Sequence, residues 1–230
     1  MSSRVKGPWW DEKRIEWYER ASDHSDFQER LSALIKRFIP EDESVTELGC
    51  GLGYQGELLC RSGYRVRSYD IDSSVIKRAE ERSGLGIFRV ADYLEIDERR
   101  DAVLSVFFGR ITEGDNLERL LSLADKHLVY IQSAHSGQSP ALRRKGDNTE
   151  KTIAFLKERN IPFTHEKHTI PFPQPLKSIE EGRDFISSYY GKEKADDYLP
   201  YIKESNNREF PYSLMNNKEF IVFDIRKDKT

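Results

Sequence analysis

The sequence predicts an α/β fold, a doubly wound and mostly parallel sheet of seven strands with N-terminal helices and a helical insertion before the last strand. Short apolar runs typical of buried strands alternate, from residue 44 onward, with stretches in which apolar residues recur at helical spacing. This alternation produces a parallel sheet with helical crossovers on both faces. A cluster of glycines follows the first apolar run, at the turn from strand to helix where such folds bind their ligands.

The expected strands are apolar runs bounded by turn residues, and they cover residues 44–48, 64–72, 86–90, 102–108, 127–133, 162–170 and 219–225. Between them we expect a helix that ends near Ser62, a helix over residues 73–82, and a helix that carries Leu117 and Leu120. A further helix is expected to begin at Asp147, because Glu150 stands at the position of a capping box.

Residues 11–38 also have helical periodicity, and Ser25 and Gln28 form a capping-box pair at the start of its clearest stretch. We therefore expect an N-terminal helical cap over residues 1–40, followed by the main domain over residues 41–230.

The segment between the last two strands is expected to be an insertion over about residues 171–215. Its first residues are rich in proline, which favours an extended course. Ser178 and Glu181 then form a capping-box pair at the start of an amphipathic helix. We interpret this segment as a helical lid, with a role in the core as the alternative.

The charge balance limits the partners. The chain has 37 Lys and Arg against 40 Asp and Glu, a formal net charge of -3, whereas general nucleic-acid binders carry a basic excess that displaces counterions from phosphates. We expect a small-molecule substrate and no nucleic-acid partner.

No apolar stretch approaches the roughly 20 residues that span a bilayer, and the start lacks the apolar core of a signal peptide. We therefore expect a cytoplasmic protein with no membrane partner; the sequence does not indicate its oligomeric state.

The segment ELGCGLG, from Glu47 to Gly53, is the part of the sequence that most clearly indicates a ligand-binding site. Glycines at alternate positions let the backbone turn sharply and approach a ligand at distances that a side chain would prevent. A nucleotide-like ligand is expected here, at the carboxyl edge of the parallel strands. Cys50 lies within this motif and is expected to be a small packed thiol rather than a nucleophile.

The turn GLGYQG, residues 51–56, also matches a dinucleotide fingerprint, and Asp70 follows at a distance that suits the ribose of NAD. A nicotinamide-dependent oxidoreductase is therefore an alternative. Glu47 precedes the glycines and Asp92 follows the third expected strand, and such an oxidoreductase has no general need for either carboxylate.

With these residues the chain resembles the class I S-adenosylmethionine-dependent methyltransferases. The matching segments follow the first four expected strands and read ELGCGLG, YDIDSSVIKRAEE, VADYLEI and DAVLSVFFGRI. The resemblance covers about residues 45–131, and more weakly the last strand. It implies a Rossmann-like methyltransferase fold and S-adenosylmethionine as the cofactor, with S-adenosylhomocysteine as its product.

The resemblance also implies roles for single residues. Gly49, Gly51 and Gly53 would line the methionine part of the cofactor, with Glu47 ordering the loop. Asp70 would accept hydrogen bonds from both ribose hydroxyls. The remaining cofactor-binding residues would lie around the adenine and the reacting methyl group, and they are Ile71, Asp92, Tyr93, Val106 and Phe107.

Further candidates lie outside these motifs. His135 follows the fifth expected strand and is the best candidate for a general base, with an exposed loop histidine as the alternative. Trp10, Tyr18 and Tyr189 are candidates for contacts with the substrate, although the aromatic N-terminus can equally anchor a helix. No metal site is expected, because His165 and His168 would face opposite sides of a strand.

The leading hypothesis is a methyltransferase that acts on a small molecule, because an aromatic N-terminus and a helical insertion resemble pocket walls more than a basic groove. A macromolecular acceptor such as RNA is a weaker alternative. A non-catalytic module that binds S-adenosylmethionine is a third possibility, besides the NAD-dependent oxidoreductase.

Overall fold

The computed structural model describes residues 9–134 and 148–227, and these form two compact units. Of the described residues, 9–28 and 169–219 make up the first unit, and 29–134, 148–168 and 220–227 make up the second. The units therefore divide the chain differently from the expected boundary at residue 40, because the first helix groups with the segment before the last strand.

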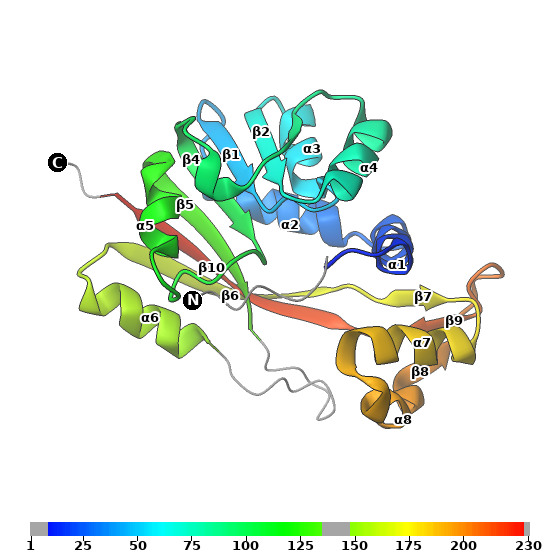
Figure 1. Cartoon of the computed structure of the whole chain (residues 1–230). Helices are drawn as coiled ribbons and strands as arrows, with labels where there is room; N and C mark the ends of the chain where they lie inside the picture. Colours follow the sequence, from blue (N-terminus) through cyan, green and yellow to red (C-terminus); the bar gives the residue numbers. More distant parts are fainter. Residues whose placement is uncertain (1–8, 135–147, 228–230) are drawn as a thin grey trace. The chain divides into compact units, whose positions relative to one another are not determined.

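The second unit is built on a seven-stranded sheet with the order β3-β2-β1-β4-β5-β10-β6 (Figure 1). Neighbours from β3 to β5 are parallel, and β10 is antiparallel to β5. The strands are β1 Ser44–Leu48, β2 Arg65–Asp70, β3 Phe88–Val90, β4 Arg100–Val106, β5 Ala124–Ser133, β6 Phe163–Pro171 and β10 Asn217–Arg226. The predicted doubly wound, mostly parallel fold is confirmed.

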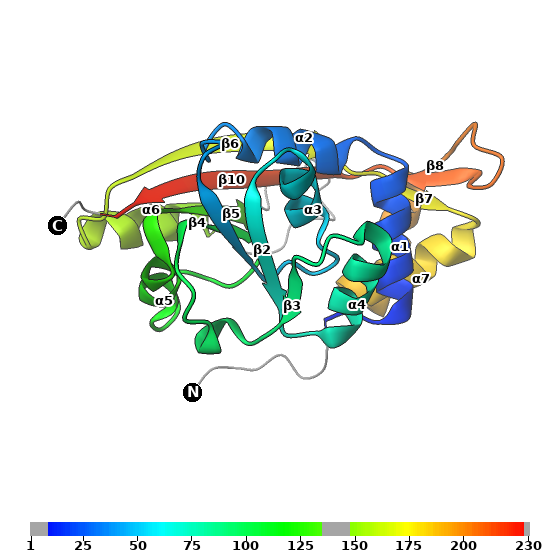
Figure 2. The same ribbon diagram turned by 90° about the horizontal axis from the view of Figure 1, so that it is seen from above.

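Helices lie on both faces of this sheet. Leu48 shares a core with Leu117 and Leu156 of the helices α5 and α6, whereas its neighbour Glu47 faces Gly56 of α3 on the other side. The helices are α2 Phe27–Ile35, α3 Tyr54–Arg61, α4 Ser73–Ser83, α5 Asn116–Ser122 and α6 Thr149–Glu158, with a 3-10 turn η1 at Tyr93–Glu95. Strands β10 and β6 lie side by side beyond β5 (Figure 2).

A buried polar cluster ties the strands together at the amino-terminal ends of β1 and β5. The His127 ring is fully buried, with Nδ1 at 2.6 Å from Asp224 Oδ1 and Nε2 at 2.9 Å from Glu43 Oε2. Ser44 donates to Asp101, and these hydrogen bonds hold the pKa of the Asp101 carboxyl well below its ordinary value. This edge lies opposite the glycine loop and has a structural role.

The first unit contains a small antiparallel sheet with the order β7-β9-β8. The insertion contains helices, as expected, but also this sheet, which the sequence did not predict because strands of three residues leave no periodic pattern. The elements of this unit are α1 Glu12–Asp23, β7 Gln174–Leu176, α7 Ile179–Tyr190, η3 Lys192–Lys194, α8 Ala195–Tyr198, η4 Leu199–Tyr201, β8 Ile202–Glu204 and β9 Tyr212–Leu214.

The predicted helix starts have mixed outcomes. The start of α7 is confirmed, because Ser178 Oγ accepts a hydrogen bond from the Glu181 N–H at 3.1 Å. The capping box at Ser25 and Gln28 is wrong. The Ser25 hydroxyl donates to the Ala21 carbonyl of the preceding helix, and the Gln28 amide donates to side chains of α1, so the periodic stretch divides into α1 and α2. The capping residue proposed for α6, Asp147, lies outside the described residues.

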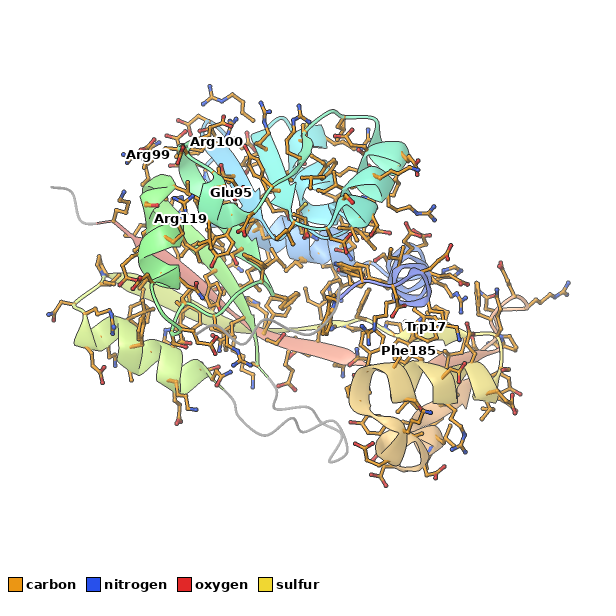
Figure 3. The ribbon with its side chains drawn as sticks, viewed as in Figure 1. Trp17, Glu95, Arg99, Arg100, Arg119 and Phe185 are labelled. Atoms are coloured by element: carbon orange, nitrogen blue, oxygen red, sulfur yellow. The ribbon has the colours of Figure 1, made fainter. Side chains whose placement is uncertain are left out.

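Arg20 organises the first unit from within α1. Its side chain is 5% exposed, and Nη1 donates to Glu181 Oε1 at 2.7 Å and to the Pro175 carbonyl. Burial alone raises a carboxyl pKa, but hydrogen bonds from the Lys177 N–H and from Arg20 hold the pKa of Glu181 below its ordinary value. Trp17 donates to the same carboxylate, and its ring meets Phe185 edge-on at 5.3 Å (Figure 3).

We expect Arg20→Met to lower the free energy of unfolding of the first unit by about 3 kcal/mol, because the Glu181 carboxylate loses its buried cationic partner. All three tryptophans, at positions 9, 10 and 17, belong to this unit, so denaturant unfolding followed by tryptophan fluorescence reports on it. The control is Arg183→Met, whose ion pair with Asp196 is exposed, and which should change stability by less than about 1 kcal/mol. Equal effects of the two substitutions would contradict a central role of Arg20.

Candidate functional site

The glycine loop between β1 and α3 has a left-handed backbone at three positions. Gly49, Gly51 and Gly53 have φ angles of 65°, 52° and 73°, which residues with a side chain rarely adopt. A Cβ at Gly49 would lie 2.2 Å from the Phe108 ring, and one at Gly53 would lie 2.3 Å from the Phe88 ring. Two of the three glycines are therefore required by the packing of the protein itself, as well as by the turn.

Asp70, the last residue of β2, joins the loop to the neighbouring strand. Its Oδ2 accepts from the Gly51 N–H at 2.8 Å, and its Oδ1 accepts from the Asp72 N–H at 3.0 Å. Burial raises the pKa of the carboxyl, although both backbone hydrogen bonds oppose this effect. Each carboxylate oxygen can accept a second hydrogen bond, so Asp70 retains capacity for a ligand with two hydroxyl groups.

Glu47 lies behind the loop and is 2% exposed. Its Oε2 accepts from the Ser68 hydroxyl at 2.7 Å, and the Gly56 N–H also donates to the carboxylate. Burial raises the pKa of Glu47 from 4.5 to about 7, a rise that these hydrogen bonds only partly oppose. A Cβ at Gly56 would lie 2.2 Å from Ser68 Oγ and 2.6 Å from Glu47 Oε2, so this glycine allows α3 to approach the sheet.

Apolar side chains are exposed where β2, β3 and β4 end. The exposed fractions are 69% for Ile71, 53% for Val90, 58% for Leu94 and 38% for Phe107. Large apolar residues seldom gather on the surface without a partner, and the carboxyl edge of parallel strands is where α/β sheets bind ligands. Phe107 also has a φ of 55°, a strained backbone that concentrates at functional sites.

Asp92 and Tyr93 continue this edge beyond β3. The Asp92 carboxylate accepts from the Leu94 N–H at 3.0 Å and so begins the turn η1. Tyr93 is half-buried against the Phe108 ring at 5.4 Å, and its hydroxyl donates to Asn116 Oδ1 at 2.8 Å. The fixed turn leaves one Asp92 oxygen for a ligand.

Arg119 holds this turn in place and is a residue that the sequence did not reveal. From α5 it donates to the Tyr93 carbonyl through Nε and Nη2, at 3.1 and 2.8 Å, and also to the Ile96 carbonyl (Figure 3). The sequence gives no sign of these hydrogen bonds, because their acceptors are main-chain carbonyls more than twenty positions away. Ser68 and Phe108 were missed as well, because their contacts with Glu47 and Gly49 join separate strands of the sheet or the turns that follow them.

The other candidates fall outside this group. His135 lies outside the described residues. Burial raises the pKa of the Cys50 thiol well above its ordinary value, which opposes a role as a nucleophile. The His165 and His168 rings pack on different residues of β10, Phe223 and Phe220. Within residues 9–134 and 148–227, no three His, Cys, Asp or Glu side chains are grouped as metal ligands would be.

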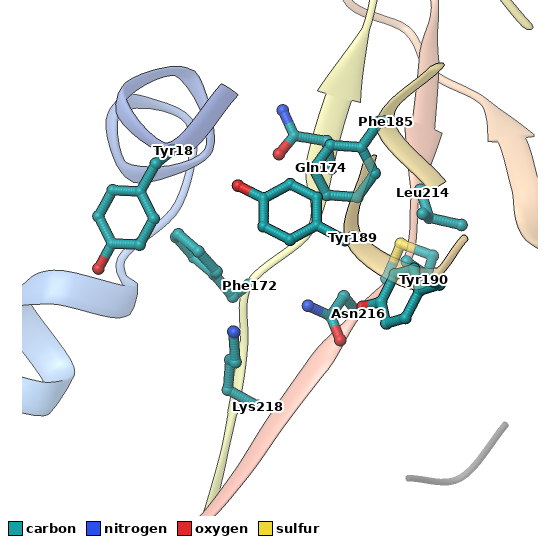
Figure 4. Close-up of a pocket in the computed structure, with 10 residues that line it drawn as sticks. Tyr18, Phe172, Gln174, Phe185, Tyr189, Tyr190, Leu214, Asn216 and Lys218 are labelled. Atoms are coloured by element: carbon teal, nitrogen blue, oxygen red, sulfur yellow. The ribbon is translucent and has the colours of Figure 1, made fainter. Parts of the chain in front are cut away.

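The substrate candidates belong to the first unit. Tyr18 and Tyr189 both line a pocket there (Figure 4), and the Trp10 ring supports Tyr18 edge-on at 5.5 Å. In the described ranges, no helix combines the length and the apolar character needed to cross a bilayer.

Comparison with known proteins identifies the fold. No protein-family model matches the sequence, and no curated protein matches it. Among solved structures, a protein from Pyrococcus horikoshii provisionally assigned as an RNA methyltransferase is 16% identical, with a TM-score of 0.54, over 98% of this chain and 93% of that one.

Magnesium protoporphyrin IX methyltransferase from Synechocystis PCC 6803, whose structure contains bound S-adenosylmethionine, is 15% identical, with a TM-score of 0.51, over 97% of this chain and 88% of that one. The cyclase SpnF is 16% identical, with a TM-score of 0.52, over 86% and 80% of the two chains. The chain therefore has the class I methyltransferase fold. Because a cyclase shares it, the reaction has to be argued from the site.

The raised pKa of Glu47 predicts how stability depends on pH. Because this carboxyl ionises at about 7 in the folded protein and at about 4.5 when exposed, its contribution is complete below about pH 4.5 and is lost as the pH rises through about 7. We expect Glu47→Gln to gain about 3 kcal/mol of unfolding free energy relative to the wild type between about pH 4 and about pH 8.

Urea unfolding followed by circular dichroism at several pH values measures this difference. Glu118→Gln, at an exposed position on α5, corrects for the removal of a surface carboxyl. Parallel stability curves for the wild type and Glu47→Gln would contradict the raised pKa.

Proposed function

We propose that the protein is an S-adenosylmethionine-dependent methyltransferase that acts on a small-molecule acceptor. The observation that carries the proposal is the hydrogen bond between the Gly51 N–H and Asp70 Oδ2. It brings a left-handed glycine loop and a carboxylate with remaining acceptor capacity together at the carboxyl edge of the sheet. Exposed apolar side chains extend this edge over the ends of three strands.

The residues present fit the cofactor. Asp70 suits a ribose, because a carboxylate without donors can accept from two adjacent hydroxyls. Ile71, at 69% exposure, offers an apolar surface to the adenine ring, and Asp92 offers an acceptor to the exocyclic amine. Gly49, Gly51 and Gly53 would line the methionine part, with Val106 and Phe107 beside the methyl group.

The cofactor, when bound, supplies a methyl group already activated by a sulfonium. The protein therefore has to bind the acceptor, align it with the methyl group and exclude water. Alignment alone can contribute roughly 7–11 kcal/mol in favourable cases. A base is required only for an acceptor that arrives protonated; His135 remains the candidate from the sequence. The chain uses its fixed turn at Asp92, held by Arg119, to keep the adenine side of the site ordered.

A small-molecule acceptor is favoured over a nucleic acid by the nearly balanced charge, with a net value of -3. The first unit also contains a pocket lined by the candidate residues Tyr18 and Tyr189. A concave pocket in which half of the lining residues are aromatic suits a small ligand.

We expect calorimetry to show binding of S-adenosylhomocysteine in the micromolar range, weakened at least about tenfold, or about 1.4 kcal/mol, by Asp70→Ala. The matched control is Asp72→Ala, which removes the exposed carboxylate that caps α4. This control should lose some stability, about 1 kcal/mol, and keep its affinity for the ligand.

The same measurement with NAD tests the oxidoreductase alternative. Binding of NAD without binding of S-adenosylhomocysteine would overturn the proposal. Binding of S-adenosylhomocysteine, without methyl transfer from S-adenosylmethionine to any small molecule of a cell extract, would indicate a non-catalytic binding module instead.

A further inference from the structure

The pocket of the first unit is lined by ten residues from α1, from α7 and from the two segments around β7 and β9. Five of its lining residues are aromatic, and three others carry an amide or an ammonium group. The aromatic residues are Tyr18, Phe172, Phe185, Tyr189 and Tyr190 (Figure 4).

Two antiparallel segments form one side of the pocket. Gln174 pairs with Leu214 in the sheet, and two residues earlier the Phe172 N–H donates to the Asn216 carbonyl at 2.8 Å. Because side chains on a strand alternate between faces, all four of these residues share one face. Lys218 lies two positions beyond Asn216 and continues this face into β10.

The helices α7 and α1 supply the aromatic walls. The Phe185 and Tyr189 rings lie one helical turn apart, with centroids at 4.8 Å. Burial raises the pKa of the Tyr189 hydroxyl well above its ordinary value, so this hydroxyl stays protonated. Tyr18 is fixed by contacts on two sides, because Gln28 donates to its hydroxyl and Phe172 meets its ring edge-on at 5.4 Å.

The one charged group among the described lining residues is positive. Lys218 carries the ammonium group, and its Nζ lies 5.9 Å from the centroid of the Phe172 ring. Asn216 and Gln174 add amide groups, and none of the described lining residues is acidic. A cationic ligand would be repelled by Lys218, whereas an anionic group gains a charge-assisted hydrogen bond.

We propose that this pocket binds a small molecule with an aromatic ring system and one anionic group, the rings between the tyrosines and Phe172 and the anion at Lys218. The inference goes beyond the proposed function and does not depend on it, because every lining residue of the pocket lies in the first unit. A ring system suits the aromatic walls, and an anionic group suits the Lys218 ammonium group.

A pair of fluorescent probes tests the proposal. Anilinonaphthalene sulfonate and phenylnaphthylamine share their rings, and only the first carries an anionic group. We expect the wild type to bind the sulfonate more tightly, and Lys218→Met to weaken its binding about tenfold while changing the affinity for the neutral probe less than about twofold.

Three further variants keep the result interpretable. Lys218→Arg should restore most of the preference for the sulfonate, because it keeps the charge. Lys192→Met, at an exposed lysine outside the pocket, should behave as the wild type. Tyr189→Leu should weaken both probes, because it removes a ring from the wall.

Equal loss of both probes in Lys218→Met, or an unchanged preference for the sulfonate, would overturn the inference. These measurements require no cofactor. Cofactor binding by Lys218→Met is measured in a separate experiment, by calorimetry with S-adenosylhomocysteine. Retained cofactor binding with an unchanged probe preference would refute the anionic ligand of the pocket alone. Absence of cofactor binding in the wild type would refute the proposed function, whatever the probes show.

Discussion

The contact between the Gly51 N–H and the Asp70 carboxylate is the constraint on which the candidate site depends. Gly51 has a left-handed backbone, and its N–H donates to Asp70, at the end of the neighbouring strand, at 2.8 Å. The same carboxylate accepts from the Asp72 N–H, at the start of α4. One side chain therefore fixes the positions of a loop, a strand end and a helix start, and its remaining acceptor capacity faces the same edge.

Behind this contact, a second carboxylate performs a structural task. Glu47 is buried between Ser68 and Gly56, where no side chain larger than a hydrogen fits on the helix. Burying a carboxyl group is costly unless it is hydrogen-bonded or protonated, and the raised pKa of Glu47 shows that both compensations apply near neutral pH. The two carboxylates beside the glycine loop thus differ in role, because Asp70 is half-buried at the sheet edge and Glu47 lies inside the protein.

Much of the fold could be predicted from the sequence, because buried parallel strands are apolar runs that stand out against helical periodicity. The strand positions follow from such runs, as HLVYIQS in β5 illustrates. The small sheet β7-β9-β8 could not be predicted, because three residues are too few to establish a period. The roles of Arg119 and Lys218 could not be predicted either. Arg119 donates to distant main-chain carbonyls, and Lys218 reaches the pocket only through the register of its strand. The capping box predicted at Ser25 was wrong because the Ser25 hydroxyl donates to the Ala21 carbonyl of the preceding helix α1.

The prolines of the insertion have a consequence for association between molecules. Because Phe172 and Gln174 direct their main-chain groups toward the strand that carries Leu214 and Asn216, the intervening positions 173 and 175 face outward. Both are proline and lack an N–H group, and Arg20 occupies the Pro175 carbonyl. The outer edge of β7 therefore offers little to a further strand, which protects this three-stranded sheet from edge-to-edge aggregation.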